Sequence, residues 1–175
     1  AKKGTPTMGG LVVIVGVLVS YFLATVLTGS TIELPAILVL FLMTGLGLVG
    51  FIDDFIKTHK RRSLGLRGWP KVLGQVIVAV IFGLVAINFP DENGVTPASM
   101  SISFIRDTHF NFALLGAGIG LVAFLAWIII IVTSTSNAVN LTDGLDGLAT
   151  GASIFTIGSF VIMNFWQQNQ SCFSS

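Results

Sequence analysis

Three polar segments interrupt an otherwise apolar chain, and each combines residue types that can bind phosphate or a divalent cation. Residues 2–10 read Lys-Lys-Gly-Thr-Pro-Thr-Met-Gly-Gly, and residues 53–57 read Asp-Asp-Phe-Ile-Lys. Residues 137–147 read Asn-Ala-Val-Asn-Leu-Thr-Asp-Gly-Leu-Asp-Gly. Carboxylates can hold Mg²⁺, lysines can contact phosphate oxygens, and glycines let a ligand approach the backbone closely. These segments therefore suggest chemistry on a phosphorylated substrate.

Two adjacent carboxylates, Asp53 and Asp54, directly follow an apolar run. If that run is a helix that continues past them, Asp53 and Lys57 are neighbours one turn apart, and Asp54 points about 100° away. One carboxylate can then be paired while the other serves a cation or a substrate. The plainer alternative is a solvated helix end with one ion pair. Two acids at a helix C-terminus oppose the helix dipole, which favours a functional reason for the pair.

The segment at residues 137–147 places four amide or carboxylate side chains among glycines. Such groups can bind a ribose, a base edge or the water shell of magnesium. A capped turn between two helices explains one or two of them, because Asn and Asp are good N-caps, but it does not explain four. The spacing also differs from an EF-hand loop, which needs a closing Glu. Residues 2–10 suit an anion but lack the Gly-Lys-Ser/Thr of a P-loop.

Five apolar runs must position these segments. Of the 175 residues, 53% are hydrophobic and 10% are charged, too few charges to cover a water-soluble globule of this size. Each run approaches the roughly 20 residues that a helix needs to cross a bilayer, and none alternates as a barrel strand would. A large soluble core of five buried helices is the alternative, but such helices would show a polar stripe. We predict an all-α, polytopic transmembrane bundle, a single integral-membrane domain over 1–175, with spans at about 8–27, 35–52, 72–89, 113–132 and 148–165.

Lysine and arginine are concentrated in alternate connections between these spans, namely before the first span and between the second and third. The excess of positive charge predicts cytoplasmic loops at residues 1–7, 53–71 and 133–147, so all three polar segments face one compartment. The opposite side receives residues 90–112, where Glu92-Asn93-Gly94 and Thr96-Pro97 predict turns and a small hairpin.

Several other classes of site are disfavoured. The net charge of +1 gives no reason to expect a nucleic-acid partner. The single Cys172 excludes an internal disulfide, and His59 and His109 stand apart without the spacing of zinc ligands. Closely spaced glycines predict tight helix packing instead of a ligand site. They are Gly45, Gly47 and Gly50 in the second run, and Gly116 and Gly120 in the fourth.

The three polar segments, in this order, closely resemble the signature stretches of the phospho-MurNAc-pentapeptide translocases, a branch of the polyprenyl-phosphate N-acetylhexosamine-1-phosphate transferase family. The resemblance covers most of the chain. It implies a Mg²⁺-dependent, multi-pass enzyme of the bacterial plasma membrane with its active site on the cytoplasmic face. Its implied reaction moves phospho-MurNAc-pentapeptide from UDP-MurNAc-pentapeptide to undecaprenyl phosphate, giving lipid I and UMP in peptidoglycan biosynthesis.

The resemblance also implies roles for individual residues. Asp53 is expected to deprotonate or orient the lipid phosphate, Asp54 to support Mg²⁺, and Lys2 and Lys57 to bind phosphates. Six residues are expected on the nucleotide side: Thr7, Asn140, Asp143, Gly144, Leu145 and Asp146. Family members have about ten spans, a further metal-contacting aspartate and a late histidine-rich loop. Since this chain has none of these, we expect it to correspond to the second to sixth spans of a longer protein.

Three alternatives remain at this point. A related GlcNAc-1-phosphate transferase would share mainly the paired aspartates and a looser Asn/Asp/Gly segment. Membrane prenyl transfer also uses cytoplasmic aspartates on magnesium, but it typically has a third acid where Lys57 stands. A transporter would place ionisable groups near the membrane midplane, whereas the charges here lie at the ends of the runs. The sequence leaves the oligomeric state open, a homodimer included.

Overall fold

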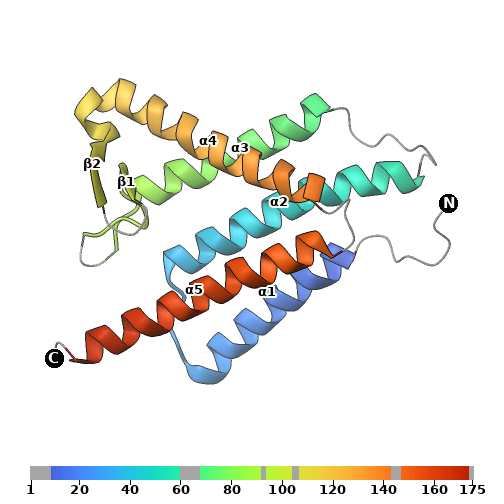
Figure 1. The fold of residues 1–175 in the computed structure, drawn as a ribbon, viewed down its shortest axis with the longest axis horizontal. Helices are drawn as coiled ribbons and strands as arrows, with labels where there is room; N and C mark the ends of the chain where they lie inside the picture. The colour runs from blue at the N-terminus through green and yellow to red at the C-terminus, as the bar shows by residue number, and fades with distance from the viewer. Residues whose placement is uncertain (1–8, 60–67, 92–93, 104–106, 143–146, 174–175) are drawn as a thin grey trace. The chain divides into compact units, whose positions relative to one another are not determined.

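The computed structural model describes residues 9–59, 68–91, 94–103, 107–142 and 147–173 (Figure 1). Five helices in these ranges are long and apolar enough to cross a membrane, which confirms the predicted all-α class and number of spans. The elements are α1 (Gly9–Thr28), α2 (Leu34–His59), α3 (Gly68–Asn88), β1 (Ser101–Ser103), β2 (Asp107–Asn111), the 3₁₀ helix η1 (Phe112–Leu115), α4 (Ala117–Thr142) and α5 (Leu148–Phe173).

Three helices extend well beyond the predicted spans. Helix α2 continues through the paired aspartates to His59, α4 continues to Thr142, and α5 continues to Phe173. The prediction of a loop at residues 133–147 was therefore wrong for its first ten positions, and that of a loop at 53–71 was wrong at residues 53–59 and 68–71, which are helical. Within the extension of α4, Thr133 donates to the carbonyl of Ile129 at 2.6 Å and Thr142 to that of Ala138 at 2.8 Å, so both hydroxyls are satisfied inside the helix and do not end it.

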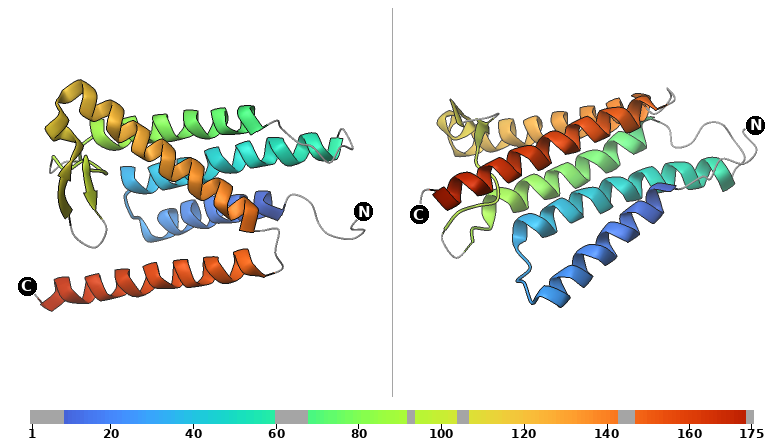
Figure 2. Two further views of the ribbon diagram at one scale, coloured as in Figure 1. Left: turned by 45° about the horizontal axis from the view of Figure 1, so that its top comes forward. Right: turned by 60° about the horizontal axis from the view of Figure 1, so that its bottom comes forward.

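The chain divides into two compact units, Ala1–Thr133 and Ser134–Ser175, and α4 crosses from one to the other. In the first unit α2 lies between α1 and α3 and runs antiparallel to both (Figures 1 and 2). One end of this unit therefore carries the last turns of α2 and the first turns of α3. The opposite end carries the connection from α1 to α2, the last turn of α3 and the strands.

Small residues bring α2 and α3 close together at two positions. A Cβ atom added to Gly45 would lie 2.9 Å from Cγ1 of Val78, and one added to Gly74 would lie 2.9 Å from Cγ2 of Val49. Each glycine therefore receives a valine from the facing helix, the small-residue packing that membrane helices use. The two contacts also fix the antiparallel register of the pair.

The other predicted packing glycines behave differently. Gly47 lies against Ile14 of α1, so close packing is confirmed there, whereas a Cβ atom at Gly50 would meet nothing within 4 Å. Gly116 and Gly120 were predicted to pack helices together, which is confirmed for Gly120 and wrong for Gly116. Gly116 precedes α4 with a φ of 87°, and Gly120 lies against the backbone carbonyl of Phe112 in η1.

The predicted hairpin is confirmed. Strands β1 and β2 pair in antiparallel fashion, with Ser101 opposite Asn111 and Ser103 opposite Asp107. The segment before β1 is tied to α3, because the backbone N–H of Ala98 donates to the carbonyl of Ala86 at 3.0 Å. The hairpin therefore closes the end of the first unit that lies away from the paired aspartates.

Candidate functional site

Asp53 and Asp54 have different surroundings, as the helical spacing predicted. Helix α2 continues past both, so Asp53 lies on the same face as Gly45 and Val49, at intervals of four residues. That face packs against α3, and Asp53 is buried, with 7% of its surface exposed. Asp54 lies on the adjoining face and is exposed. The pair thus presents one enclosed carboxylate and one that solvent can reach.

The first turns of α3 lie alongside Asp53. Since Val49 faces Gly74 and Gly45 faces Val78, each step along α2 toward His59 corresponds to a step along α3 toward Gly68. Asp53 is therefore level with the start of α3, where Lys71 is half-buried. At this end of the first unit, a buried carboxylate on α2 and a partly enclosed lysine on α3 lie at about the same level, within otherwise apolar helices.

Sequence reasoning missed two polar residues at this end. Lys71 was included only among the basic residues that set topology, and Gln75 was not considered. Gln75 has 1% of its surface exposed and lies one turn from Lys71 on the same side of α3. A sequence signal for both exists, because Lys71, Gln75, Ala79 and Gly83 follow one another at intervals of four, and such a stripe of small and polar residues marks a packed face.

This arrangement suits work on phosphate groups. An enclosed carboxylate interacts more strongly with a nearby charge than an exposed one does, because the local dielectric is lower. Asp53 can thus accept a proton or a hydrogen bond at a defined position, while Asp54 remains accessible to a cation. Lys57 follows Asp53 by one turn of α2. The structure describes its backbone but not the position of its side chain.

The described residues contain no group of three or more His, Cys, Asp and Glu side chains that could hold a metal. Asp54 provides one accessible carboxylate, and Asp143 and Asp146 lie outside the described ranges. Enzymes of phosphate chemistry usually bind Mg²⁺ through one or two carboxylates together with substrate phosphates and waters. Asp54 fits a role as one such ligand, and the described part of the chain does not complete the shell by itself.

The remaining predicted site residues divide between the second unit and undescribed positions. Asn140 lies in the last turns of α4 and is exposed, three residues after Asn137 and so on a neighbouring face. Gly147, just before α5, has a φ of 79°, and its carbonyl accepts the N–H of Gly151 at 2.9 Å. Six predicted residues lie outside the described ranges: Lys2, Thr7, Asp143, Gly144, Leu145 and Asp146.

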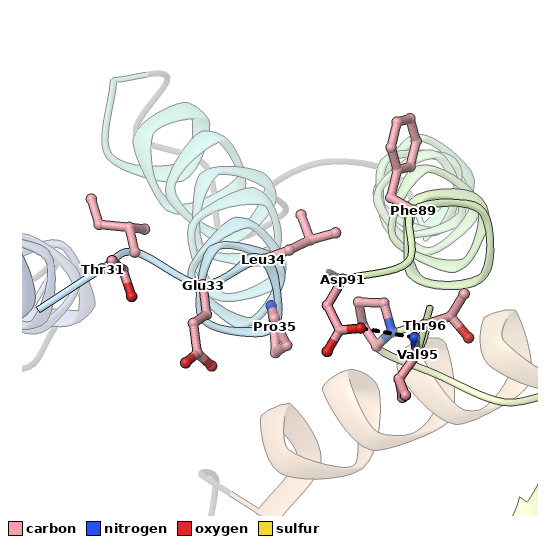
Figure 3. Close-up of a pocket in the computed structure, with 10 residues that line it drawn as sticks. Thr31, Glu33, Leu34, Pro35, Phe89, Asp91, Val95 and Thr96 are labelled. Atoms are coloured by element: carbon pink, nitrogen blue, oxygen red, sulfur yellow. Dashed lines mark hydrogen bonds between the residues drawn. The ribbon is translucent and has the colours of Figure 1, made fainter. Parts of the chain in front are cut away.

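A cavity of about 710 Å³ lies at the end of the first unit opposite Asp53. Figure 3 shows the residues that line it. The α1/α2 connection and the segment after α3 line it, with carboxylates from Glu33 and Asp91. Asp91 has a structural role there, because its Oδ1 accepts the N–H of Val95 at 2.8 Å and so holds a turn. None of the predicted site residues lines this cavity.

Comparison with known proteins gives matches over almost the whole chain. The model described as "Glycosyl transferase family 4" matches residues 36–174. A second model, described as "Phospho-N-acetylmuramoyl-pentapeptide-transferase signature 1", matches residues 2–14. No significant match was found among solved structures.

Curated relatives are identical to this chain at about half of the aligned positions. The phospho-N-acetylmuramoyl-pentapeptide-transferase of Clavibacter sepedonicus is 54% identical over 177 residues, covering 98% of this chain and 48% of the relative. Proteins with the same name from Beutenbergia cavernae and Frankia casuarinae are 50% and 53% identical, over 48% and 46% of their lengths. The chain spans about half the length of the curated relatives it matches.

Proposed function

The chain belongs to glycosyl transferase family 4, and from this we propose that the protein transfers phospho-MurNAc-pentapeptide from UDP-MurNAc-pentapeptide to undecaprenyl phosphate, giving lipid I and UMP. The observation that carries the proposal is the match of residues 2–14 to a signature of that transferase, together with 54% identity to a relative bearing its name. The five apolar helices support a lipid acceptor held in the membrane.

The reaction places specific demands on the site. An oxygen of the lipid phosphate forms a bond to the donor phosphorus that carries the sugar, while the bond from that phosphorus to UMP breaks. Both substrates are anionic, so the site must neutralise charge and align the two phosphates in line, with little covalent work for the protein. Asp53 would accept the proton of the lipid phosphate or orient it, and its enclosed position at the end of α2 supports this role.

The other proposed roles follow the family resemblance. Lys2 and Lys57 would bind phosphate oxygens. Mg²⁺, when bound, would neutralise phosphate charge, with the exposed Asp54 among its ligands. We propose that this site faces the cytoplasm of a bacterial cell, across the inner membrane. The nucleotide side would be formed by Thr7, Asn140, Asp143, Gly144, Leu145 and Asp146.

A donor comparison tests the proposal. The complete gene product is assayed in membranes for UMP release and for the lipid product, with undecaprenyl phosphate as acceptor. We expect turnover with UDP-MurNAc-pentapeptide and little with UDP-GlcNAc. The reverse preference would assign the protein to the GlcNAc-1-phosphate transferases, and turnover with neither donor would reject a sugar-phosphate transferase.

A further inference from the structure

Among the described residues, only two buried side chains are polar or charged, Asp53 and Gln75. Gln75 is also the largest side chain that is fully buried there. Its amide lies in a helix apolar enough to span a membrane, where a buried polar group is costly unless it is hydrogen-bonded. An alanine or leucine would fill such a position without that requirement, so the amide calls for a specific explanation.

The register of α2 and α3 brings Gln75 close to the level of Asp53. Asp53 comes four residues after Val49, which faces Gly74, and is therefore level with residue 70 on α3. Gln75 comes five residues later, which corresponds to about 7 Å along the helix axis. Side chains on a helix lean toward its N-terminus, and these helices are antiparallel, so the two side chains lean toward one another along the axis.

We propose that Gln75 is a positioning residue that fixes the orientation of the Asp53 carboxylate through the α2/α3 interface. This inference rests on the proposed transferase function and deepens it. A carboxylate that must accept a proton or orient a phosphate works only within a narrow geometry, and residues behind it keep it there. Gln75 has the burial, the length and the polar end that this task needs, and it lies about 7 Å along the axis from Asp53, beside the face of α3 that Gly74 and Val78 present to α2.

Steady-state kinetics of the complete gene product test the proposal. Gln75→Met keeps the length and volume of the side chain and removes the amide. We expect it to lower kcat by about 10- to 100-fold, as a small misplacement of a reacting group does, with the KM for the UDP donor unchanged within about twofold. Gln75→Glu keeps the shape but exchanges the amide for a carboxyl group, and we expect it to lower kcat as well.

A double-mutant cycle separates positioning from packing. If Gln75 acts through Asp53, adding Gln75→Met to Asp53→Asn should cost less than about threefold, because residues that act as a unit are not additive. Val78→Ala is the matched control, since Val78 packs in the same interface, against Gly45, but farther from Asp53. It should lower the unfolding temperature, and its small effect on kcat should be the same with and without Asp53→Asn.

Two results would overturn the positioning role. One is a kcat for both Gln75 variants within about twofold of wild type, well short of the loss expected from misplacement. The other is a loss from Gln75→Met that multiplies fully with that of Asp53→Asn. If Gln75→Met fails to fold, the cycle is run with Gln75→Glu. An inactive wild-type protein would instead reject the proposed function, and the wild-type assay in the same experiment distinguishes that failure.

Discussion

Asp53 and Asp54 are consecutive residues, yet one is enclosed between two helices and the other is exposed. The difference follows from helix geometry, since consecutive side chains point about 100° apart and only one can face α3. A lone solvated ion pair at a helix end would not require either carboxylate to be buried. The observed placement therefore favours two separate tasks for the pair over a shared one.

Replacing Asp53 by asparagine should distinguish these tasks. Asp53→Asn keeps the shape of the side chain but removes the proton acceptor, so we expect turnover of the complete gene product to fall by about 100- to 1000-fold. Binding of the UDP donor, measured by calorimetry, should change little. Asp54→Asn should instead raise the Mg²⁺ concentration needed for half-maximal rate. Near-normal turnover of Asp53→Asn would reduce the buried carboxylate to a structural element.

Gly147 offers a second test at the scale of one residue. Its φ of 79° is reached easily only by glycine, so Gly147→Ala should destabilise the start of α5 by about 1–2 kcal/mol. We also expect weaker donor binding, because the neighbouring residues 143–146 are proposed to contact the nucleotide. Gly158→Ala is the control, since its added Cβ atom meets nothing within 4 Å inside α5. Equal unfolding temperatures for the two variants would contradict the strain argument.

At the scale of helices, the contact between α2 and α3 sets the position of the candidate site. Gly74→Leu would force a bulky side chain against Val49, one turn from Asp53, and such overpacking typically costs about 1–3 kcal/mol. We expect a lower unfolding temperature in detergent together with reduced turnover. Gly50→Leu adds the same side chain where a Cβ atom meets nothing within 4 Å, and it should preserve both. Similar losses of unfolding temperature and turnover in the two variants would show that the α2/α3 contact at Gly74 is not critical for stability or activity.

The helices themselves could be predicted from sequence because their apolar length leaves few alternatives in a bilayer. Their ends could not, because polar residues after an apolar run need not end its helix, and the hydroxyls of Thr133 and Thr142 are satisfied by carbonyls within α4. The separation of Asp53 from Asp54 followed from helical periodicity alone. Gln75 was not found, because its significance depends on which face of α3 is covered, and that requires the register with α2.

At the scale of the whole molecule, the antiparallel order of the helices places the candidate site residues and the hairpin at opposite ends of the first unit. The aspartate end carries the buried and exposed carboxylates, whereas the other end is occupied by the hairpin, the cavity and its turn at Asp91. The second unit carries Asn140, on a helix that begins in the first unit. Assignment of these ends to the two sides of a membrane rests on the distribution of lysine and arginine.

Cysteine labelling tests that assignment, because His59 and Ser99 are exposed at opposite ends of the first unit. In a Cys172→Ser background, a membrane-impermeant maleimide should label Ser99→Cys on intact bacterial cells. The same reagent should label His59→Cys only after the membrane is opened, because the basic connection after α2 is predicted to be cytoplasmic. Thr31→Cys, in the α1/α2 connection beside the cavity, is the matched control and should label with Ser99→Cys. Labelling of His59→Cys and Ser99→Cys from the same side would contradict the assignment of α2 and α3 as full spans. Labelling of His59→Cys alone on intact cells would place the paired aspartates outside the cell, where a cytoplasmic UDP donor could not reach them.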